Sequence, residues 1–264
     1  MIAESTLLRV VLSLALVYAA VGACAWLYSD RLIFLPPPPG YPDGPAILKV
    51  PTKDGQRIAA VYRKNPSATY TLLLSHGNAE DLGSVMPLLA VLGDWGFSVL
   101  AYDYRGYGRS EGTPSEPHVY ADVDAAYDYL VRELQVEPGH VVAYGRSLGA
   151  GAALDLAVHR PLGGLVLESP FLSAFRVMTR ISLFPFDKFR NSAKIGRVRC
   201  PVLVMHGEDD EIVPFWHGRR LFDLAPEPKM LVAVPGAHHN DFVQVAGPLY
   251  AQALRDFETR LRGH

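Results

Sequence analysis

A single serine stands between two glycines at the point where an apolar run gives way to a helix-forming stretch. The segment 141–151 reads VVAYGRSLGAG, with Gly145 and Gly149 on either side of Ser147. A strand-to-helix turn this tight needs residues that tolerate strained dihedrals and close backbone approach, and it raises the serine hydroxyl above the sheet. The next amide, on Leu148, then lies at a helix N-terminus, where peptide dipoles favour an anion. The pattern predicts a nucleophilic serine.

A serine hydroxyl needs a general base to become a useful nucleophile, and the base needs a carboxylate to orient it. For a serine on this kind of turn, the expected chain order is serine, acid, histidine. The stretch EDDEIVP offers acids after one apolar run, namely Glu208, Asp209, Asp210 and Glu211. The stretch AHHND offers His238 and His239 after the next apolar run. Each cluster would lie at the carboxyl end of one of the last two predicted strands. The spacing alone does not decide which acid and which histidine take part.

Apolar, β-rich segments alternate with helical patterns from residue 46 onward. Two of these segments flank PTKDGQ, whose Asp54-Gly55 pair predicts a hairpin. Helices are expected near 81–96, 115–134, 148–159, 215–224 and 242–261. Strands that are each followed by a helix predict a mostly parallel sheet of about eight strands with helices on both faces. Ligands of such an α/β fold bind at the carboxyl ends of its strands.

A twenty-residue run near the start of the chain carries no charge. Residues 10–29 would make a helix about 30 Å long, which matches the hydrocarbon thickness of a bilayer. Trp26 and Tyr28 sit near one end of the run, where aromatic rings favour the membrane interface. We expect an uncleaved single-pass anchor, with a cleaved signal, a lipoprotein-type processing site and a core helix as alternatives. Arg9 and Arg31 flank the run on opposite sides, so the positive charges do not indicate on which side of the membrane the domain lies.

The chain is expected to divide into three parts. An anchor covers residues 1–31 and a spacer covers residues 32–45, whose four consecutive prolines favour an extended polyproline geometry. The α/β domain follows at 46–264. Within it, residues 170–199 mix apolar and basic side chains and form a short lid, although simple packing on the sheet edge would also explain them.

Composition narrows the function classes. The net charge of −2 leaves no basic face, so nucleic acid is not an expected partner. The two cysteines, Cys24 and Cys200, form no CxxC, and Cys24 lies inside the apolar run. A disulfide framework and a zinc site are therefore not expected.

Combined motifs along the chain resemble the α/β-hydrolase superfamily, and more narrowly its membrane-associated serine hydrolases related to protein depalmitoylases and Bem-forty-six-like proteins. These motifs include HGNAEDLG, YDYRGYGRSEGTPSE, YGRSLGAGAALDLA, PVLVMHGEDDEIVPFWHG and PGAHHND. The resemblance runs from about residue 45 to residue 260. It implies Ser147 as nucleophile, Asp210 as acid and His239 as base, with His238 and Asp209 as the alternatives.

The resemblance also implies an oxyanion hole made by the backbone amides of Asn78 and Leu148. The implied reaction is acyl transfer to water, with a small-molecule or lipid-linked acyl ester or thioester as substrate and without cofactor or metal. A serine peptidase of the same fold and a catalytically silent, membrane-tethered binding protein are the competing hypotheses. We expect structural roles for four further polar residues, His76, Asp103, Arg146 and Glu168.

Overall fold

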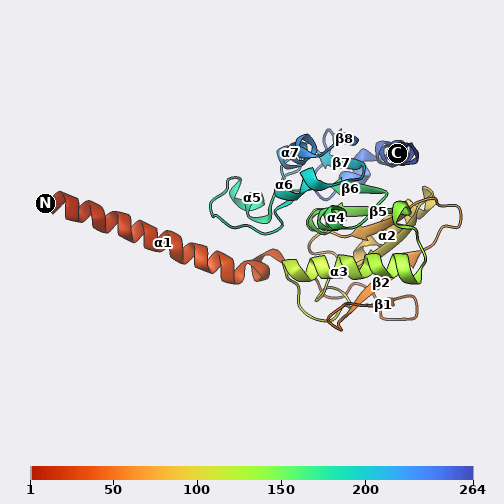
Figure 1. The fold of residues 1–264 in the computed structure, drawn as a ribbon, viewed down its shortest axis with the longest axis horizontal. Helices are drawn as coiled ribbons and strands as arrows, with labels where there is room; N and C mark the ends of the chain where they lie inside the picture. Colours follow the sequence, from red (N-terminus) through yellow and green to blue (C-terminus); the bar gives the residue numbers. More distant parts are fainter. Residues whose placement is uncertain (1, 264) are drawn as a thin grey trace.

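An eight-stranded sheet forms the centre of the computed structural model, which describes residues 2–263 (Figure 1). The strands are β1 (Leu48–Pro51), β2 (Arg57–Arg63), β3 (Thr71–Ser75), β4 (Ser98–Tyr102), β5 (Val141–Arg146), β6 (Gly164–Glu168), β7 (Val202–Gly207) and β8 (Lys229–Val234). Their order across the sheet is β1-β2-β4-β3-β5-β6-β7-β8. Strand β2 runs antiparallel to both β1 and β4, and the other neighbours are parallel. The predicted mostly parallel α/β sheet is confirmed.

Helices cover both faces of this sheet. The helices after α1 (Ile2–Ile33) are α2 (Leu82–Asp94), α3 (Glu116–Asp128), α4 (Leu148–His159), α5 (Ala174–Thr179), α6 (Asn191–Lys194), α7 (Trp216–Leu224), α8 (Phe242–Ala246) and α9 (Pro248–Arg262), with a short π-helix η1 (Tyr129–Glu133) and the 3₁₀-helices η2 (Pro138–His140) and η3 (Ile195–Arg197). Helix α5 lies away from the sheet (Figure 1). Alternate strand residues enter two separate cores: Leu73 packs with α3 and α4, whereas Leu72 and Leu74 pack with α2 and α9. This alternation follows from the two-residue period of a strand.

The final helix differs from the sequence prediction. The prediction of a single helix over residues 242–261 is wrong, because the chain forms two helices, α8 and α9, with a break at Gly247. Gly247 has a φ of +48°, in the left-handed region that favours glycine, and Pro248 has no amide hydrogen to continue the helix. Proline is instead well placed as the first residue of α9.

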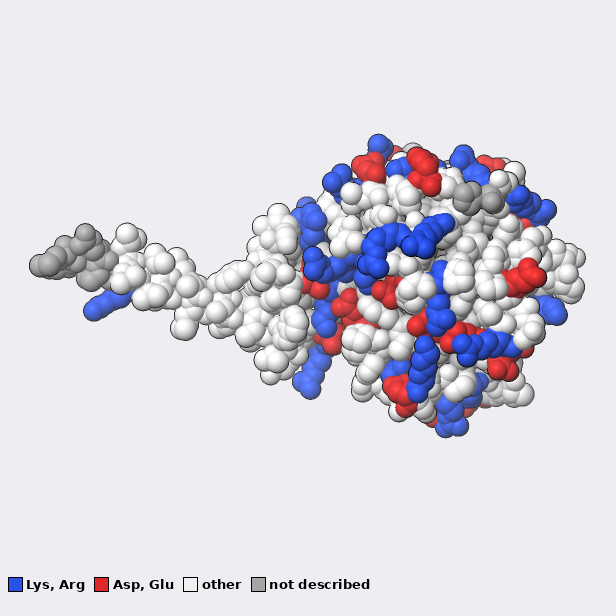
Figure 2. Space-filling view, viewed as in Figure 1, with Lys and Arg blue, Asp and Glu red and all other residues white. Residues whose placement is uncertain are grey.

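The N-terminal helix α1 (Ile2–Ile33) is longer than the expected 10–29 and projects from the domain (Figure 1). Its stretch Thr6–Ile33 is long and apolar enough to cross a membrane. Large apolar side chains along it are exposed, including Leu16 at 73% and Leu27 at 72%. Figure 2 shows charged side chains gathered on the domain, whereas most of the projecting helix carries none.

The proline-rich segment after α1 packs against the domain. Phe34 and Tyr41 are both buried, and the Tyr41 hydroxyl donates a hydrogen bond to Asp103. The Gly40 amide donates to Asp81 Oδ2 at 2.5 Å. Residues 34–41 are therefore held on the surface of the domain rather than extended away from it.

The lid segment (residues 170–199) contacts α1. Tyr18 on α1 donates a hydrogen bond to the carbonyl of Leu183 at 2.8 Å. The rings of Trp26 and Phe186 meet edge to face with centroids 5.1 Å apart. The apolar part of the lid segment therefore packs along the N-terminal helix, an arrangement that the sequence analysis did not anticipate.

Candidate active site

Ser147 occupies a strained turn between β5 and α4. Its φ of 51° and ψ of −114° lie outside the regions that side-chain-bearing residues favour. A Cβ on Gly145 would lie 2.3 Å from the Gly149 carbonyl oxygen, and a Cβ on Gly149 would lie 2.0 Å from that of Ser75. The two glycines therefore permit close backbone approach, while the strained dihedrals fall on the serine itself.

The structure brings Ser147, His239 and Asp210 together. His239 Nε2 lies 3.0 Å from Ser147 Oγ, and His239 Nδ1 lies 2.8 Å from Asp210 Oδ2. Asp210 follows β7 and His239 follows β8, so both come from the carboxyl ends of strands, as Ser147 does. With the Nδ1 proton directed at the carboxylate, the lone pair on Nε2 faces the serine hydroxyl.

Backbone amides and a second histidine hold the Asp210 carboxylate. Its Oδ1 accepts hydrogen bonds from the amides of Val213 at 2.7 Å and Ile212 at 3.0 Å. His206 Nε2 lies 3.3 Å from Oδ2. Burial alone would raise the pKa of Asp210, but His206, His239 and the Val213 amide outweigh burial and hold this pKa well below its usual range. Asp210 is therefore a fixed anion beside the His239 ring.

The neighbouring histidine and acids point elsewhere. His238 Nδ1 lies 3.1 Å from Glu211 Oε2, and both side chains are more than half exposed. Glu208 and Asp209 are exposed as well. Across residues 2–263, no group of three or more His, Cys, Asp or Glu side chains is arranged to hold a metal ion.

The SHGNAE turn (residues 75–80) follows β3 and lies directly against the serine. A Cβ on Gly77 would sit 3.7 Å from the Ser147 Cβ. Leu148 is the first residue of α4, so its amide has no carbonyl within the same helix to which it could donate. The turn and the helix N-terminus thus supply backbone beside the hydroxyl, where the amides of Asn78 and Leu148 are the expected donors.

The end of α1 holds the side chain of Asn78. Asn78 Nδ2 donates to the Ile33 carbonyl at 2.5 Å, and Asn78 Oδ1 accepts from the Leu35 amide at 3.1 Å and from the Tyr107 hydroxyl at 2.6 Å. The Leu35 amide also lies 3.0 Å from the Tyr107 hydroxyl oxygen. Sequence reasoning missed this clamp, because Ile33 and Leu35 take part through main-chain atoms that leave no side-chain signal.

Arg146 links the three segments that surround the serine. It forms ion pairs with Glu80 of the SHGNAE turn and with the buried Glu168 at 3.2 Å. Its Nη2 also donates to the His239 carbonyl at 3.2 Å. Glu80 Oε2 in turn accepts from the Gly77 amide at 2.7 Å. Arg146, which directly precedes Ser147, therefore joins the SHGNAE turn, the end of β6 and the histidine loop, a connection that the motif alone did not reveal.

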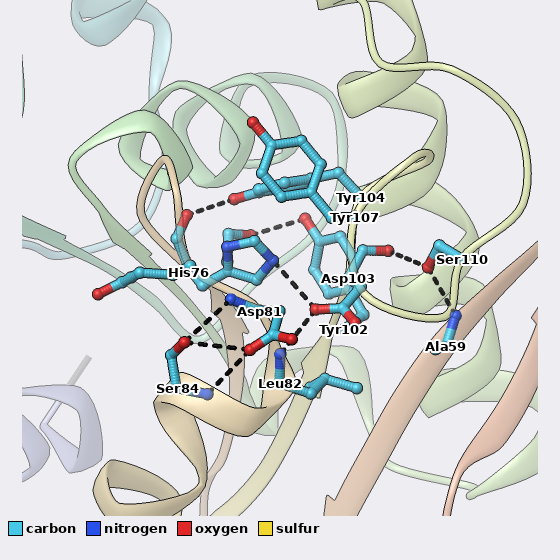
Figure 3. Close-up of polar contacts among 12 residues, drawn as sticks. Ala59, His76, Asp81, Leu82, Ser84, Tyr102, Asp103, Tyr104, Tyr107 and Ser110 are labelled. Atoms are coloured by element: carbon cyan, nitrogen blue, oxygen red, sulfur yellow. Dashed lines mark hydrogen bonds and ion pairs between the residues drawn. The ribbon is translucent and has the colours of Figure 1, made fainter. Parts of the chain in front are cut away.

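A second histidine–aspartate pair joins His76 of the SHGNAE turn to Asp103, which follows β4 (Figure 3). His76 Nε2 lies 3.3 Å from Asp103 Oδ1, and His76 Nδ1 lies 2.8 Å from the Gly77 carbonyl oxygen. The Tyr104 hydroxyl donates to the His76 carbonyl at 2.6 Å, and Asp103 Oδ1 accepts from the Leu82 amide at 2.8 Å. Both side chains are fully buried, so the pair holds loops together on the side of the turn away from solvent.

Comparisons with known proteins agree with this architecture. Residues 66–191 match the family described as "Serine aminopeptidase, S33". The chain is 41% identical to alpha/beta hydrolase domain-containing protein 17B of Xenopus tropicalis over 79% of this chain and 73% of the relative. It is 40% identical to the human protein of the same name over 78% and 72%, respectively.

Solved structures share the fold at low identity. An esterase of Pyrococcus furiosus aligns with a TM-score of 0.72 and 18% identity, over 85% of this chain and 98% of the esterase. A monoacylglycerol lipase of Paleococcus ferrophilus aligns with a TM-score of 0.62 and 22% identity, over 78% and 99%, respectively. The resemblance predicted from the sequence motifs is confirmed: the chain belongs to the α/β-hydrolase family, together with the alpha/beta hydrolase domain-containing 17 proteins.

Proposed function

We propose that the chain is a membrane-anchored serine hydrolase that cleaves ester or thioester bonds through an acyl-enzyme on Ser147. The observation that carries this proposal is the hydrogen-bonded series from Ser147 Oγ to His239 at 3.0 Å and from His239 to Asp210 at 2.8 Å. A hydroxyl, an imidazole and a carboxylate in this order are the parts that nucleophilic acyl transfer requires.

In the acylation step, Ser147 Oγ attacks the carbonyl carbon while His239 Nε2 accepts the hydroxyl proton. The carbonyl π electrons move to oxygen, and the resulting oxyanion accepts hydrogen bonds from the amides of Asn78 and Leu148. Each such donor stabilises the transition state by about 3 kcal/mol. The Asp210 carboxylate stabilises the imidazolium, which then protonates the departing alcohol or thiol as the tetrahedral intermediate collapses.

In the deacylation step, His239 Nε2 removes a proton from water as the water oxygen attacks the acyl-serine carbonyl. The second tetrahedral intermediate uses the same two backbone donors. Its collapse returns the proton from the imidazolium to Ser147 Oγ and releases the carboxylic acid. One histidine therefore serves as base and acid in both halves of the reaction.

The exposure of α1 supports the membrane anchor. A core helix would be buried, yet most of the large apolar side chains of Thr6–Ile33 are exposed. Leaving apolar area in water costs about 25 cal/mol for each Å², so this surface favours a bilayer. An intact N-terminus in the membrane fraction, resistant to alkaline extraction, is the expected result. A mature chain that starts beyond residue 20 would identify a cleaved signal instead. A reporter fused after the C-terminus gives the side of the membrane.

Acyl esters and acyl thioesters are the proposed substrate class. The motif resemblance to protein depalmitoylases supports lipid-linked acyl groups. A helix that holds the active site at a membrane also favours substrates dissolved in the bilayer. The description of the matching family favours a second candidate, an aminopeptidase. Parallel assays on acyl esters, acyl thioesters and aminoacyl anilides separate the two candidates.

The direct test compares the full chain with Ser147→Ala. We expect the wild-type chain to react with a short fluorophosphonate and to hydrolyse p-nitrophenyl acetate, and the variant to do neither. Full labelling of the variant would contradict the role of Ser147. A correctly folded wild-type chain that neither labels nor turns over would favour the silent binding protein.

A further inference from the structure

An apolar groove runs between the C-terminal half of α1 and helix α5. Its volume is about 220 Å³. Its lining comes from α1 and from the lid segment, which includes α5. The lining residues are Ala25, Ser29, Leu32, Ile33, Ala174, Phe175, Met178, Thr179 and Phe184. The four lining residues on α1 lie at positions i, i+4, i+7 and i+8, so they share one helix face. One wall of the groove is therefore the N-terminal helix itself.

The walls of this groove are hydrocarbon. The two side-chain hydroxyls among the lining residues are satisfied within their own segments. The Ser29 hydroxyl donates to the Trp26 carbonyl at 3.2 Å, and the Thr179 hydroxyl lies 2.6 Å from the Ile181 carbonyl. No charged residue lines the groove in the described part of the chain. Such a surface favours an apolar occupant and offers little to a polar head group.

One groove-lining residue is hydrogen-bonded to the turn that contacts Ser147. Ile33 lines the groove, and its carbonyl accepts the 2.5 Å hydrogen bond from the Asn78 side chain. Asn78 follows Gly77, where a Cβ would lie 3.7 Å from the Ser147 Cβ. The groove wall is thus joined through two consecutive residues of the SHGNAE turn to the nucleophile.

The rim of the groove faces the surroundings of α1. Leu32 on α1 is 73% exposed and Met178 on α5 is 85% exposed. The lid segment follows α1 as far as Tyr18, which binds the Leu183 carbonyl. Tyr18 lies fifteen residues before Ile33, or about 22 Å along a helix. The groove therefore opens on the part of the molecule whose apolar surface suits a bilayer.

We propose that the α1–α5 groove binds the hydrocarbon chain of the acyl group that Ser147 attacks, with α1 as part of the substrate site. This inference rests on the proposed function. At about 220 Å³ the groove is smaller than the roughly 300–1,000 Å³ of pockets that enclose a whole ligand. It suits a slender chain that enters from the bilayer and lies partly within it.

The first experiment fills the groove. The full chain in nanodiscs is assayed on p-nitrophenyl acetate and p-nitrophenyl dodecanoate, as wild type, Ala25→Trp and Ala20→Trp. Ala25 lines the groove, whereas Ala20 lies exposed on α1 outside it. We expect Ala25→Trp to lower the dodecanoate-to-acetate ratio of kcat/KM roughly tenfold or more, because lost methylene contacts discriminate to that degree. Ala20→Trp should keep the wild-type ratio. Equal ratios in all three proteins would overturn the inference.

A second substitution fills the groove from its α5 side and keeps the test valid if Ala25→Trp fails to fold. Ala174→Phe on α5 should lower the same ratio. Reaction with a short fluorophosphonate reports separately on Ser147. If the wild type neither labels nor hydrolyses acetate, the proposed function fails; if it does both and neither groove variant changes the ratio, the groove assignment alone fails.

A cross-linking experiment identifies the occupant. A fluorophosphonate with a long alkyl chain and a terminal diazirine is attached to Ser147 and then irradiated. Cross-links in peptides that contain residues 25–33 or 174–184 are expected. Cross-links confined to other peptides, or to bilayer lipid or a second copy of the chain, would overturn the assignment.

Discussion

The pairs His239–Asp210 and His76–Asp103 both lie at the carboxyl edge of this sheet, and they differ in what the second ring nitrogen of the histidine faces. His239 is held by Asp210 at 2.8 Å and directs Nε2 at the Ser147 hydroxyl. His76 lies 3.3 Å from Asp103, has its other nitrogen on the Gly77 carbonyl, and is fully buried against the rings of two tyrosines (Figure 3). The same two residue types thus occur once beside a nucleophile and once in a buried hydrogen-bonded cluster that holds loops together.

The difference shows why residue type alone does not define a general base. A base needs a lone pair directed at the proton that it removes, and the His239 pair has that geometry. The His76 pair instead holds the backbone of the turn that contacts Ser147. One pair is therefore expected to control the rate and the other to control order and stability.

The largest expected effect comes from removing the imidazole of the first pair. His239→Ala should lower kcat for p-nitrophenyl acetate by roughly 10⁵–10⁶, as loss of a triad histidine does. The matched variant His238→Ala should stay within about twofold, because His238 points at Glu211 on the surface. Steady-state kinetics with the full chain measures both. A large loss in His238→Ala and none in His239→Ala would exchange the two assignments.

Removing the charge of the acid should have the next largest effect. Asp210→Asn should reduce kcat by roughly 10⁴, because the amide favours the wrong histidine tautomer. Asp209→Asn is the neighbouring control and should change little, since Asp209 is exposed. The low pKa of Asp210 keeps the carboxylate ionised above about pH 4, so protonation of this group should not limit kcat at higher pH. A loss in Asp209→Asn equal to that in Asp210→Asn would contradict the geometry.

A smaller effect is expected where α1 meets the SHGNAE turn. Leu35→Pro removes the amide that donates to Asn78 Oδ1, whereas Leu35→Ala keeps it. We expect Leu35→Pro to lower kcat roughly fivefold, since a positioning hydrogen bond contributes about 1 kcal/mol. KM for p-nitrophenyl acetate should stay near the wild-type value. Equal activity of the two variants would show that the clamp does not position the turn.

The smallest effect concerns stability and belongs to the second pair. Burial alone would lower the pKa of His76, but Asp103 and the Gly77 carbonyl outweigh burial and raise this pKa above 6.5. A raised folded-state pKa stabilises the protein fully below the unfolded value, and this stabilisation is lost as pH rises through the folded value. His76→Gln should therefore lower Tm more at about pH 5.5 than at about pH 8.5. Each kcal/mol lost from the free energy of unfolding lowers Tm by roughly 2–4 °C in a domain of this size. A gap that widens with rising pH would contradict this assignment.

Much of the fold was predictable because its signals are local. Apolar strand segments alternate with helical patterns, and the glycines beside Ser147 mark a tight turn. The break at Gly247 was also readable from its Gly-Pro pair. Spacing alone did not choose between His238 and His239; family resemblance did. The Asn78 clamp and the groove depend on contacts of α1 and Leu35 with residues 43 or more positions away, through main-chain atoms and apolar contacts that no motif records.

The most direct measurement of the central claim is capture of the acyl-enzyme. The full chain is mixed with p-nitrophenyl dodecanoate, quenched in acid within the first turnover, digested and analysed by mass spectrometry. We predict a dodecanoyl adduct on Ser147 in the wild-type chain and none in His239→Ala quenched at the same time. Product release without any adduct on Ser147, or an adduct on another residue that forms at the rate of turnover, would contradict the account.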